Sequence, residues 1–390
     1  MQGGPQGVAV DSAGDTVFVT NADSNSMSII DGKTANVKAT IDGLAKPIGV
    51  AVNEADDIVY VAQTDDSSVV ALTKSGMGSR TTIDTGGPGW ALAVDQDDDT
   101  VYATAGVTQG GSGSLAVIDG TRQTLSSVVH LPGMDPLAAA VNDRTDRVYV
   151  TGQNSVGAAV LDGGTLFMDD TIPLIGSYWS VAVDQADDTA YFANYQEQGS
   201  LAIVAGRTSQ VVSNRPLGYP WGVAVAQRAD RVYVTRGPTN SVSTFDAITG
   251  RSASPDIAIG GFPIAVAVDQ SGENAGTVYV ASSDSRSVSV LASVRPAVTS
   301  EASGPGSNVV VTVESPQAAF DLAARAVTAV CFVPVGDTAG SLGGRLQALP
   351  GDRWKVRVPT RLASGAYRVV VTFDGGLQAR AGRVNVRPPG

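Results

Sequence analysis

Hydrophobic and polar residues alternate with a period of two along most of this chain, which is the pattern of β-strands. One stretch of the pattern, Gly-Val-Ala-Val-Asp at residues 7–11, recurs in related form from residues 49, 91, 138, 180, 222 and 265. The successive intervals are 42, 42, 47, 42, 42 and 43 residues. This regularity predicts seven copies of one supersecondary unit.

Each copy continues with further predicted strands. A turn rich in Asp, Asn and Gly leads to a second strand such as 18–21, then a third such as 26–31, and a weaker fourth such as 37–41. Glycine and alanine in the first strand suit an innermost position, where neighbouring units crowd together. Four antiparallel strands in each unit of about 40–45 residues are typical of a propeller, because radial repetition leaves only short, protected edges. We therefore predict an all-β fold with a seven-bladed β-propeller over residues 1–293.

The second strand carries a family resemblance. The tetrad Phe18-Val19-Thr20-Asn21, followed by the strand at 26–31, resembles the YVTN β-propeller repeat. The resemblance covers residues 7 to about 292, and the last tetrad position varies among Asn21, Gln63, Ala105, Gly152, Asn194, Arg236 and Ser282. It implies the propeller fold but no single function, since such propellers include cell-surface, binding and enzymatic members.

The seventh copy has three clear strands, the last ending at Leu291. Two explanations of its missing fourth strand stay open at this point. Either residues 294–299 supply that edge, or the natural chain begins further upstream than Met1.

A second domain is expected over residues 294–390. The repeat stops after Arg295-Pro296, and five new strands separated by gaps with Gly, Pro and Ser follow. About 95 residues of this pattern predict a two-sheet sandwich. The segments 354–359 and 363–371 resemble the end of an IPT/TIG-type immunoglobulin-like domain, which implies a spacer or interaction module.

Composition narrows the class of partner. The net charge of −12 divides into 15 bases and 32 acids before residue 295, and 11 bases and 6 acids from there on. An acidic body argues against nucleic-acid binding, which depends on neutralising phosphates. No apolar run approaches the roughly 20 residues that a membrane-spanning helix needs. Cys331 is the only cysteine, which excludes an intrachain disulfide framework and a thiolate metal cluster.

The first residues carry no basic region followed by an apolar stretch, so no signal peptide is expected in this sequence. The first repeat starts almost at once, at Gly7. We expect a mature or trimmed form of an extracytoplasmic or secreted protein; a cytoplasmic location is the alternative.

The most informative feature for function is a set of aromatic residues. The residue before each first strand should rim one mouth of the propeller channel, and these residues are Gln6, Ile48, Trp90, Leu137, Trp179, Trp221 and Ile264. Three of the four tryptophans therefore share one equivalent position, with further aromatic residues within two residues of it. We predict that this mouth binds a ligand through Trp90, Tyr178, Trp179, Tyr219, Trp221 and Phe262. The alternative is that these large residues plug the channel and hold the blades apart.

Polar groups add a catalytic alternative. Tyr195, Glu197 and Arg236 follow second strands of adjacent blades, and such groups could polarise a carbonyl or move a proton. They would be the catalytic residues if the protein is an enzyme; otherwise they are solvated loop side chains. His130, the only histidine, ends an outer strand and is expected to face solvent.

We predict no metal and no cofactor. Zinc needs several His or Cys ligands, which this chain lacks. The Asp clusters near Asp57, Asp98 and Asp188 are interpreted as turn formers in preference to calcium ligands. No glycine-rich nucleotide motif precedes a helix.

The leading prediction is thus a binding or interaction protein that recognises a small molecule, protein or glycan at the mouth. The alternative is a lyase, isomerase or hydrolase that acts on a small cyclic or aromatic substrate there. A purely structural spacer would leave the clustered tryptophans unexplained.

Overall fold

The computed structural model describes residues 3–76, 78–107, 112–153, 155, 157–253, 255–271 and 275–291, together with strands between residues 295 and 386. The chain divides into two compact units. The first comprises Met1–Ser252 and Asp256–Val290, and the second comprises Ala253–Pro255 and Leu291–Gly390. The sequence-based division placed the start of the second domain at residue 294.

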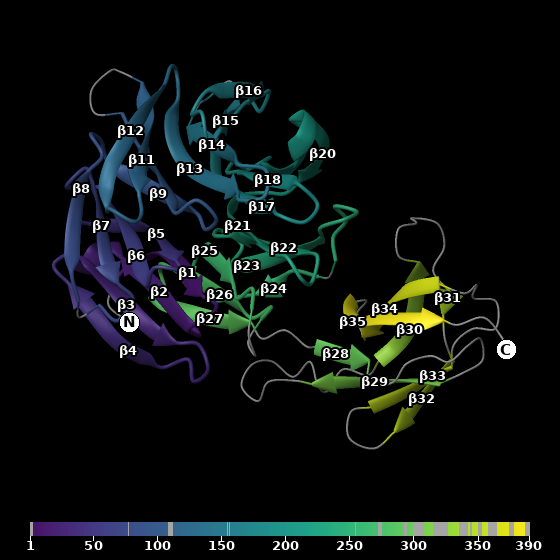
Figure 1. Cartoon of the computed structure of the whole chain (residues 1–390). Coiled ribbons are helices and arrows are strands. Elements are labelled where there is room, and N and C mark those ends of the chain that lie inside the picture. Colours follow the sequence, from purple (N-terminus) through teal and green to yellow (C-terminus); the bar gives the residue numbers. More distant parts are fainter. Residues whose placement is uncertain are drawn as a thin grey trace. The chain divides into compact units, whose positions relative to one another are not determined.

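The first unit is a seven-bladed β-propeller, so the predicted all-β propeller fold is confirmed (Figure 1). Its blades are antiparallel sheets of consecutive strands. Blade 1 contains β1 (Pro5–Asp11), β2 (Thr16–Asn21), β3 (Ser26–Asp31) and β4 (Val37–Asp42). Blade 2 contains β5 (Pro47–Asn53), β6 (Ile58–Gln63), β7 (Ser68–Thr73) and β8 (Arg80–Asp84). Blade 3 contains β9 (Gly89–Asp95), β10 (Thr100–Ala105), β11 (Gly113–Asp119) and β12 (Thr124–Leu131).

The remaining blades repeat this arrangement. Blade 4 contains β13 (Asp135–Asn142), β14 (Arg147–Gln153), β15 (Ala158–Asp162) and β16 (Met168–Ile172). Blade 5 contains β17 (Tyr178–Asp184), β18 (Thr189–Asn194), β19 (Ser200–Ala205) and β20 (Gln210–Pro216). Blade 6 contains β21 (Pro220–Ala226), β22 (Arg231–Arg236), β23 (Ser241–Asp246) and β24 (Ile257–Ala258). Blade 7 contains β25 (Pro263–Val268), β26 (Val278–Ser282) and β27 (Ser287–Leu291), and short 3₁₀ turns occur at Ala22–Ser24 and Gly206–Thr208.

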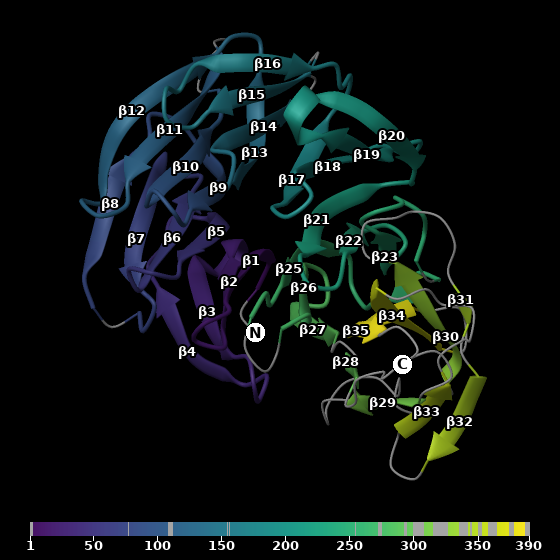
Figure 2. The same cartoon turned by 45° about the vertical axis from the view of Figure 1, so that its right-hand side comes forward.

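The first strands form the inner ring around the propeller axis (Figure 2). Each packs against the first strand of the next blade, and β25 packs against β1, which closes the circle. Close approach explains the small residues in these strands. A Cβ atom added at Gly49 would lie 2.6 Å from the carbonyl oxygen of Trp90 in the next blade, which is too short for any real contact.

The first residue of the tetrad joins neighbouring blades. The hydroxyl of Tyr60 donates to the Gly120 carbonyl at 3.1 Å, and that of Tyr191 donates to the Ala247 carbonyl at 2.8 Å. Tyr279 makes the equivalent bond to Gly32 at 3.1 Å and so links blade 7 to blade 1. These tyrosines are fully buried, where an unpaired hydroxyl would be costly. The ring therefore closes by the same contact that joins blade 2 to blade 3 and blade 5 to blade 6.

Blade 7 keeps the three strands that the sequence indicated, within the part of the chain that the structure describes. The explanation that residues 294–299 supply a fourth strand is wrong for residues 295–298. That segment is β28 (Arg295–Val298), which pairs with β29 of the second unit, with Arg295 opposite Glu314 and Val298 opposite Val311. Its backbone groups are therefore engaged elsewhere.

The second unit contains two four-stranded antiparallel sheets. One has the order β28, β29 (Asn308–Glu314), β33 (Arg353–Arg357) and β32 (Arg345–Leu349). The other has the order β31 (Leu342–Gly343), β30 (Val327–Pro334), β34 (Gly365–Phe373) and β35 (Gln378–Val386). All five strands expected from the sequence have counterparts among these eight; the immunoglobulin-like assignment stays a prediction. In the described residues of the whole chain, no helix has the length and apolar character needed to cross a membrane.

Candidate functional site

The predicted rim positions share a backbone irregularity. In blade 5, Tyr178 pairs with Asn194 and Ser180 with Ala193, so Trp179 has no partner residue in the ladder. A register shift occurs at the equivalent place in all seven blades. An extra residue of this kind is a β-bulge, which redirects a side chain and is common beside binding sites. The side chain at each bulge therefore does not follow the alternation by which the other residues of the first strand point to opposite faces of the sheet.

The third residue of the tetrad stabilises the bulge. Thr235 Oγ1 accepts a hydrogen bond from the Gly222 amide at 2.8 Å and donates to the Ile264 carbonyl of the next blade at 3.1 Å. Thr20 does the same, with 2.8 Å to the Gly7 amide and 2.6 Å to the Ile48 carbonyl. One hydroxyl thus bonds to a backbone amide at the bulge of its own blade and to a backbone carbonyl at the bulge of the next blade.

Five aromatic side chains gather where blades 5, 6 and 7 meet, and we call them the aromatic cluster. The residues are Trp179, Tyr195, Tyr219, Trp221 and Phe262. The Trp179 and Trp221 ring centroids lie 4.9 Å apart, and Tyr195 lies 4.5 Å from Trp221 and 5.7 Å from Trp179. Tyr219 is 5.7 Å from Tyr195, and Phe262 is 5.6 Å from Trp221. These spacings are those of direct, tilted ring contacts.

All five rings are partly exposed. Because the rings touch one another, no ligand fits between them; a sandwiched group would need ring planes roughly 7 Å apart, twice an ordinary contact distance. A ligand would instead rest on the exposed faces and edges of the cluster.

Two members of the cluster occupy left-handed backbone conformations. Tyr219 has φ 54° and Phe262 has φ 53°, and each directly precedes a proline. The equivalent residues of blades 1 and 2, Gly4 and Lys46, have φ 69° and 51°, so the conformation belongs to the turn. For a bulky residue this region is unfavourable, and strain of this kind concentrates at functional sites.

The neighbouring backbone accommodates one ring directly. A Cβ atom added at Gly237 would lie 2.7 Å from ring atoms of Phe262. The Phe262 amide donates to Asn240 Oδ1 at 2.7 Å, which fixes the turn that carries the ring. The Phe262 ring therefore packs against Gly237, and the hydrogen bond to Asn240 fixes its backbone.

The structure brings together four of the six residues predicted to bind a ligand: Trp179, Tyr219, Trp221 and Phe262. Tyr178 instead is 4% exposed and packs edge-on against Phe192 at 6.4 Å in the core between blades, and burial raises its pKa. Its neighbour Trp179 takes the bulge, so Tyr178 points the other way. Trp90 lies in blade 3 with its indole nitrogen beside Gly106, and no ring contact joins it to the cluster in the described residues.

The three residues of the catalytic alternative lie around the same loops. Arg236 Nε donates to the Gly218 carbonyl at 3.0 Å, and its Nη1 forms an ion pair with Asp256 at 2.5 Å. Glu197 is exposed. Burial, with a smaller repulsion from Tyr219, raises the pKa of Tyr195, so its phenol stays protonated at neutral pH. Tyr195 can therefore donate a hydrogen bond but does not serve as a base.

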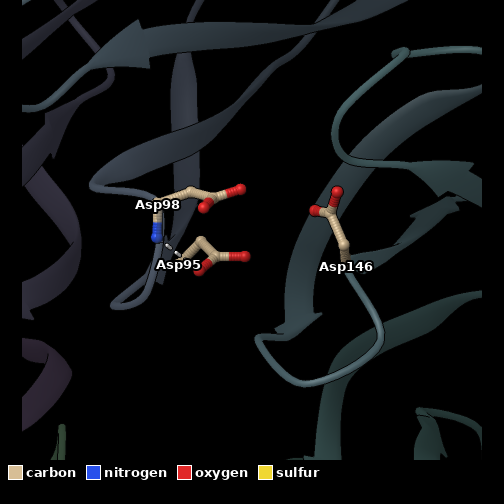
Figure 3. A group of neighbouring side chains, drawn as sticks. All are labelled: Asp95, Asp98 and Asp146. Carbon is tan, nitrogen blue, oxygen red and sulfur yellow. Dashed lines mark hydrogen bonds between the residues drawn. The ribbon is translucent and has the colours of Figure 1, made fainter.

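A second group of ionisable residues lies on the turns between first and second strands, where the sequence pattern was interpreted as turn-forming Asp clusters near Asp57, Asp98 and Asp188. Asn142 of blade 4 donates to Asp188 of blade 5 at 2.8 Å. Between blades 3 and 4 the corresponding residues are both acids, Asp95 and Asp146. Figure 3 shows Asp95 and Asp98 on one turn, facing Asp146 across the seam. Carboxylate oxygens of these three residues lie within 4.8 Å of one another.

Burial is the main cause that raises the pKa values of Asp95 and Asp146; repulsion from Asp98 and Asp97 adds to the shift of Asp95, and repulsion from Asp95 and Asp98 adds to that of Asp146. The nearby Asp143 is half-buried, and desolvation together with repulsion from Asp95 and Asp97 raises its pKa to about 7. Carboxylate oxygens are the ligands that Ca²⁺ prefers. Asp95 Oδ1 is already used by its own turn, since it accepts from the Asp97 and Asp98 amides at 3.0 and 3.1 Å. The turn-forming interpretation of Asp98 and its neighbours thus has direct support, and we describe this seam as acidic without assigning a ligand to it.

Comparison with known proteins supports the fold. No protein-family model and no curated protein matches the sequence. Among solved structures, the chain is similar to one described as Kuenenia stuttgartiensis Hydrazine Synthase, with a TM-score of 0.68 and 15% sequence identity. The match covers 75% of this chain and 96% of that chain. At this identity the likeness shows a shared propeller fold and carries no information about activity.

Proposed function

We propose that this protein is a binding protein whose ligand rests on the aromatic cluster at the mouth of the propeller. The observation that carries the proposal is the convergence of five partly exposed rings from four separate stretches of chain, with two of the rings on strained backbone. Surface aromatic residues with a fixed geometry are typical recognition elements, because a large rigid ring loses little entropy on binding.

The alternative that these rings only hold the blades apart has less support. The same bulge position is occupied by Gln6, Ile48, Leu137 and Ile264 in other blades, so the fold does not require tryptophan there. The indoles of Trp179 and Trp221 are therefore not needed to form the bulge, and we attribute them to ligand binding.

The proposed family, C-terminal module and location rest on the sequence resemblances. The tyrosine and threonine contacts give the tetrad a structural role in every part of the ring, which supports membership of the YVTN-type propellers. We extend the proposal to an IPT/TIG-like module over the C-terminal residues and to an extracytoplasmic location. The partner is a small molecule, a protein or a glycan, and the aromatic cluster is the recognition surface in each case. The enzyme alternative gains no specific contact, because the Arg236 guanidinium is engaged by Asp256.

The experiment compares equivalent tryptophans. A thermal-shift screen of chemically diverse small molecules and glycans is followed by titration of each hit against the wild type, Trp221→Leu and Trp90→Leu. Trp90 occupies the equivalent bulge of blade 3 but lies outside the cluster, so Trp90→Leu is the matched control. We expect Trp221→Leu to weaken binding at least tenfold and Trp90→Leu to change it less than threefold, in line with the loss of a recognition aromatic. Binding of every hit to Trp221→Leu with wild-type affinity would contradict the proposal.

A further inference from the structure

We infer that the ligand of the aromatic cluster is an organic cation, an alkylammonium or quaternary ammonium group. This inference rests on the proposed function and specifies its ligand class. It follows from the charges around the rings, the electrostatic character of the ring faces and the shape of the cluster.

The first observation is the charge of the loops at the mouth. The loops that leave second strands and enter first strands carry five acids, Asp23, Asp65, Asp66, Glu197 and Asp284. Against these five they carry two bases, Lys46 and Arg286. All seven side chains belong to exposed residues. The mouth is therefore negative, which raises the local concentration of cations and repels anions.

The second observation is the balance of charge beside the rings themselves. Glu197 lies two residues after Tyr195 on the same loop and makes no ion pair in the part of the chain that the structure describes. Arg236 is the neighbouring base, and its charge is countered by Asp256 at 2.5 Å. Among the described residues, the uncompensated acidic residue on the loop that carries Tyr195 is thus Glu197.

The third observation is the cluster itself. Aromatic faces carry partial negative charge and attract ammonium groups within about 6 Å of the ring centroid. The burial-raised pKa of Tyr195 leaves its ring a neutral phenol. Since the rings touch and leave no slot between them, a flat ligand cannot intercalate, whereas a compact ammonium group can rest on two or three faces. A cation is the ligand class that satisfies the acids and the rings together.

The test uses an isosteric pair. Choline is titrated by calorimetry and tryptophan fluorescence against 3,3-dimethylbutan-1-ol, which has the same shape without the charge; tetramethylammonium is the minimal probe. We expect choline to bind at least tenfold more tightly than the neutral alcohol, and its affinity to fall as sodium chloride rises. Glu197→Gln should weaken choline binding three- to tenfold, and Trp221→Leu should abolish it. Asp169→Asn, an exposed acid on the outer strand β16 and outside the loops of the mouth, is the matched control and should change affinity less than twofold.

The outcomes separate the two claims. Equal binding of choline and the alcohol, or wild-type choline affinity in Glu197→Gln, overturns the cation inference. Neutral hits that still depend on Trp221, without choline binding, overturn the inference and leave the proposed function standing. If no ligand of either kind depends on Trp221, both fail. Circular dichroism of each variant distinguishes loss of binding from loss of fold.

Discussion

At the scale of single residues, the informative feature is an aromatic side chain on a backbone conformation that suits glycine. Glycine adopts positive φ without the Cβ clash that other residues suffer, and the left-handed region costs an L-residue roughly 1 kcal/mol or more. Blade 1 uses Gly4 at this turn, while blades 6 and 7 use Tyr219 and Phe262. Lys46 of blade 2 keeps the same conformation away from the rings, so the feature that distinguishes blades 6 and 7 is the aromatic side chain at this turn.

Replacement by glycine separates the two roles. Tyr219→Gly removes a partly exposed ring but relieves strain, so we expect the free energy of unfolding to change by less than about 1 kcal/mol while ligand affinity falls at least fivefold. Lys46→Gly, at the same conformation in blade 2, should not weaken affinity, because it removes no ring and no acid, and should leave stability equal or up to about 1 kcal/mol higher. Urea unfolding and ligand titration measure both quantities. A large loss of stability in Lys46→Gly would show that the turn is not strained.

At the scale of elements, the bulge in the first strand explains why small residues and threonines recur at equivalent positions of the repeat. The bulge carbonyl of one blade lies close to the small residue of the preceding blade, and in blades 1 and 6 the tetrad threonine bonds to both. Gly7, Gly49 and Gly222 each face such a carbonyl at 2.3, 2.6 and 2.5 Å from an added Cβ. These contacts are backbone contacts, which cannot relax by a side-chain rotation.

Gly49→Ala should therefore destabilise the propeller by about 2 kcal/mol, the range seen when a packed interior is overfilled. Gly260→Ala is the matched control, because a Cβ atom at Gly260 meets nothing within 4 Å. We expect its effect to stay within about 0.5 kcal/mol, as for ordinary surface positions. Chemical denaturation of both variants checks the difference, and equal stabilities would refute the packing argument.

The threonine link predicts a second effect on stability. Thr235→Val keeps the side-chain shape but leaves the Gly222 amide and the Ile264 carbonyl without that hydroxyl, which should cost about 1–3 kcal/mol for buried polar groups. Thr82→Val on the exposed strand β8 is the comparison and should change stability by less than about 0.5 kcal/mol. Thermal unfolding of the two variants suffices, and a neutral Thr235→Val would mean that water replaces the hydroxyl.

At the scale of the whole molecule, the blades form a closed ring, so the stability of the propeller depends on the contacts at every boundary between blades. Polar links repeat around the ring, as when the Gln227 amide donates to Gln270 at 3.1 Å and the Gln270 amide donates to Ser12 at 2.9 Å. The seam between blades 3 and 4 differs, because Asp143 takes the place of those glutamines and faces Asp95 and Asp97. We therefore expect this seam to contribute to the pH dependence of stability.

The direction of this pH dependence follows from linkage. The pKa of Asp143 is about 7 in the folded protein and close to 3.9 in the unfolded chain, so between these values the folded state holds a proton that the unfolded state has released. Stability should therefore fall as pH rises from about 4 to about 7. Asp143→Asn should flatten this slope and raise stability at pH 8 by about 1–2 kcal/mol, a value reduced for solvent screening.

Urea unfolding at pH values from 4 to 8, in EDTA so that divalent cations do not contribute, measures the slope. Asp65→Asn, an exposed acid in another blade, is the control and should run parallel to the wild type. Parallel slopes for Asp143→Asn and the wild type would exclude the acidic seam as a source of pH dependence.

Much of the fold was predictable from the sequence because its determinants are local and repeated. Alternation with period two marks each strand, and seven returns of one segment specify the number of blades. The site was predictable only in part. The shared position of Trp90, Trp179 and Trp221 was visible in the repeat, but the contribution of Tyr195 to the rings, the burial of Tyr178 and the separation of Trp90 were not, because each depends on which side of a bulge or seam a side chain lies.

The sequence by itself determined the all-β class, the seven blades and the equivalence of the rim positions, because a periodic pattern needs no knowledge of distant contacts. Only the tertiary structure decided which rings touch, which acids face each other and which charges are already paired. Those properties arise from the bulges, the left-handed turns and the closure of the circle, which bring together residues from different blades. Chemistry at the mouth depends on such contacts between blades, and a linear pattern does not record them.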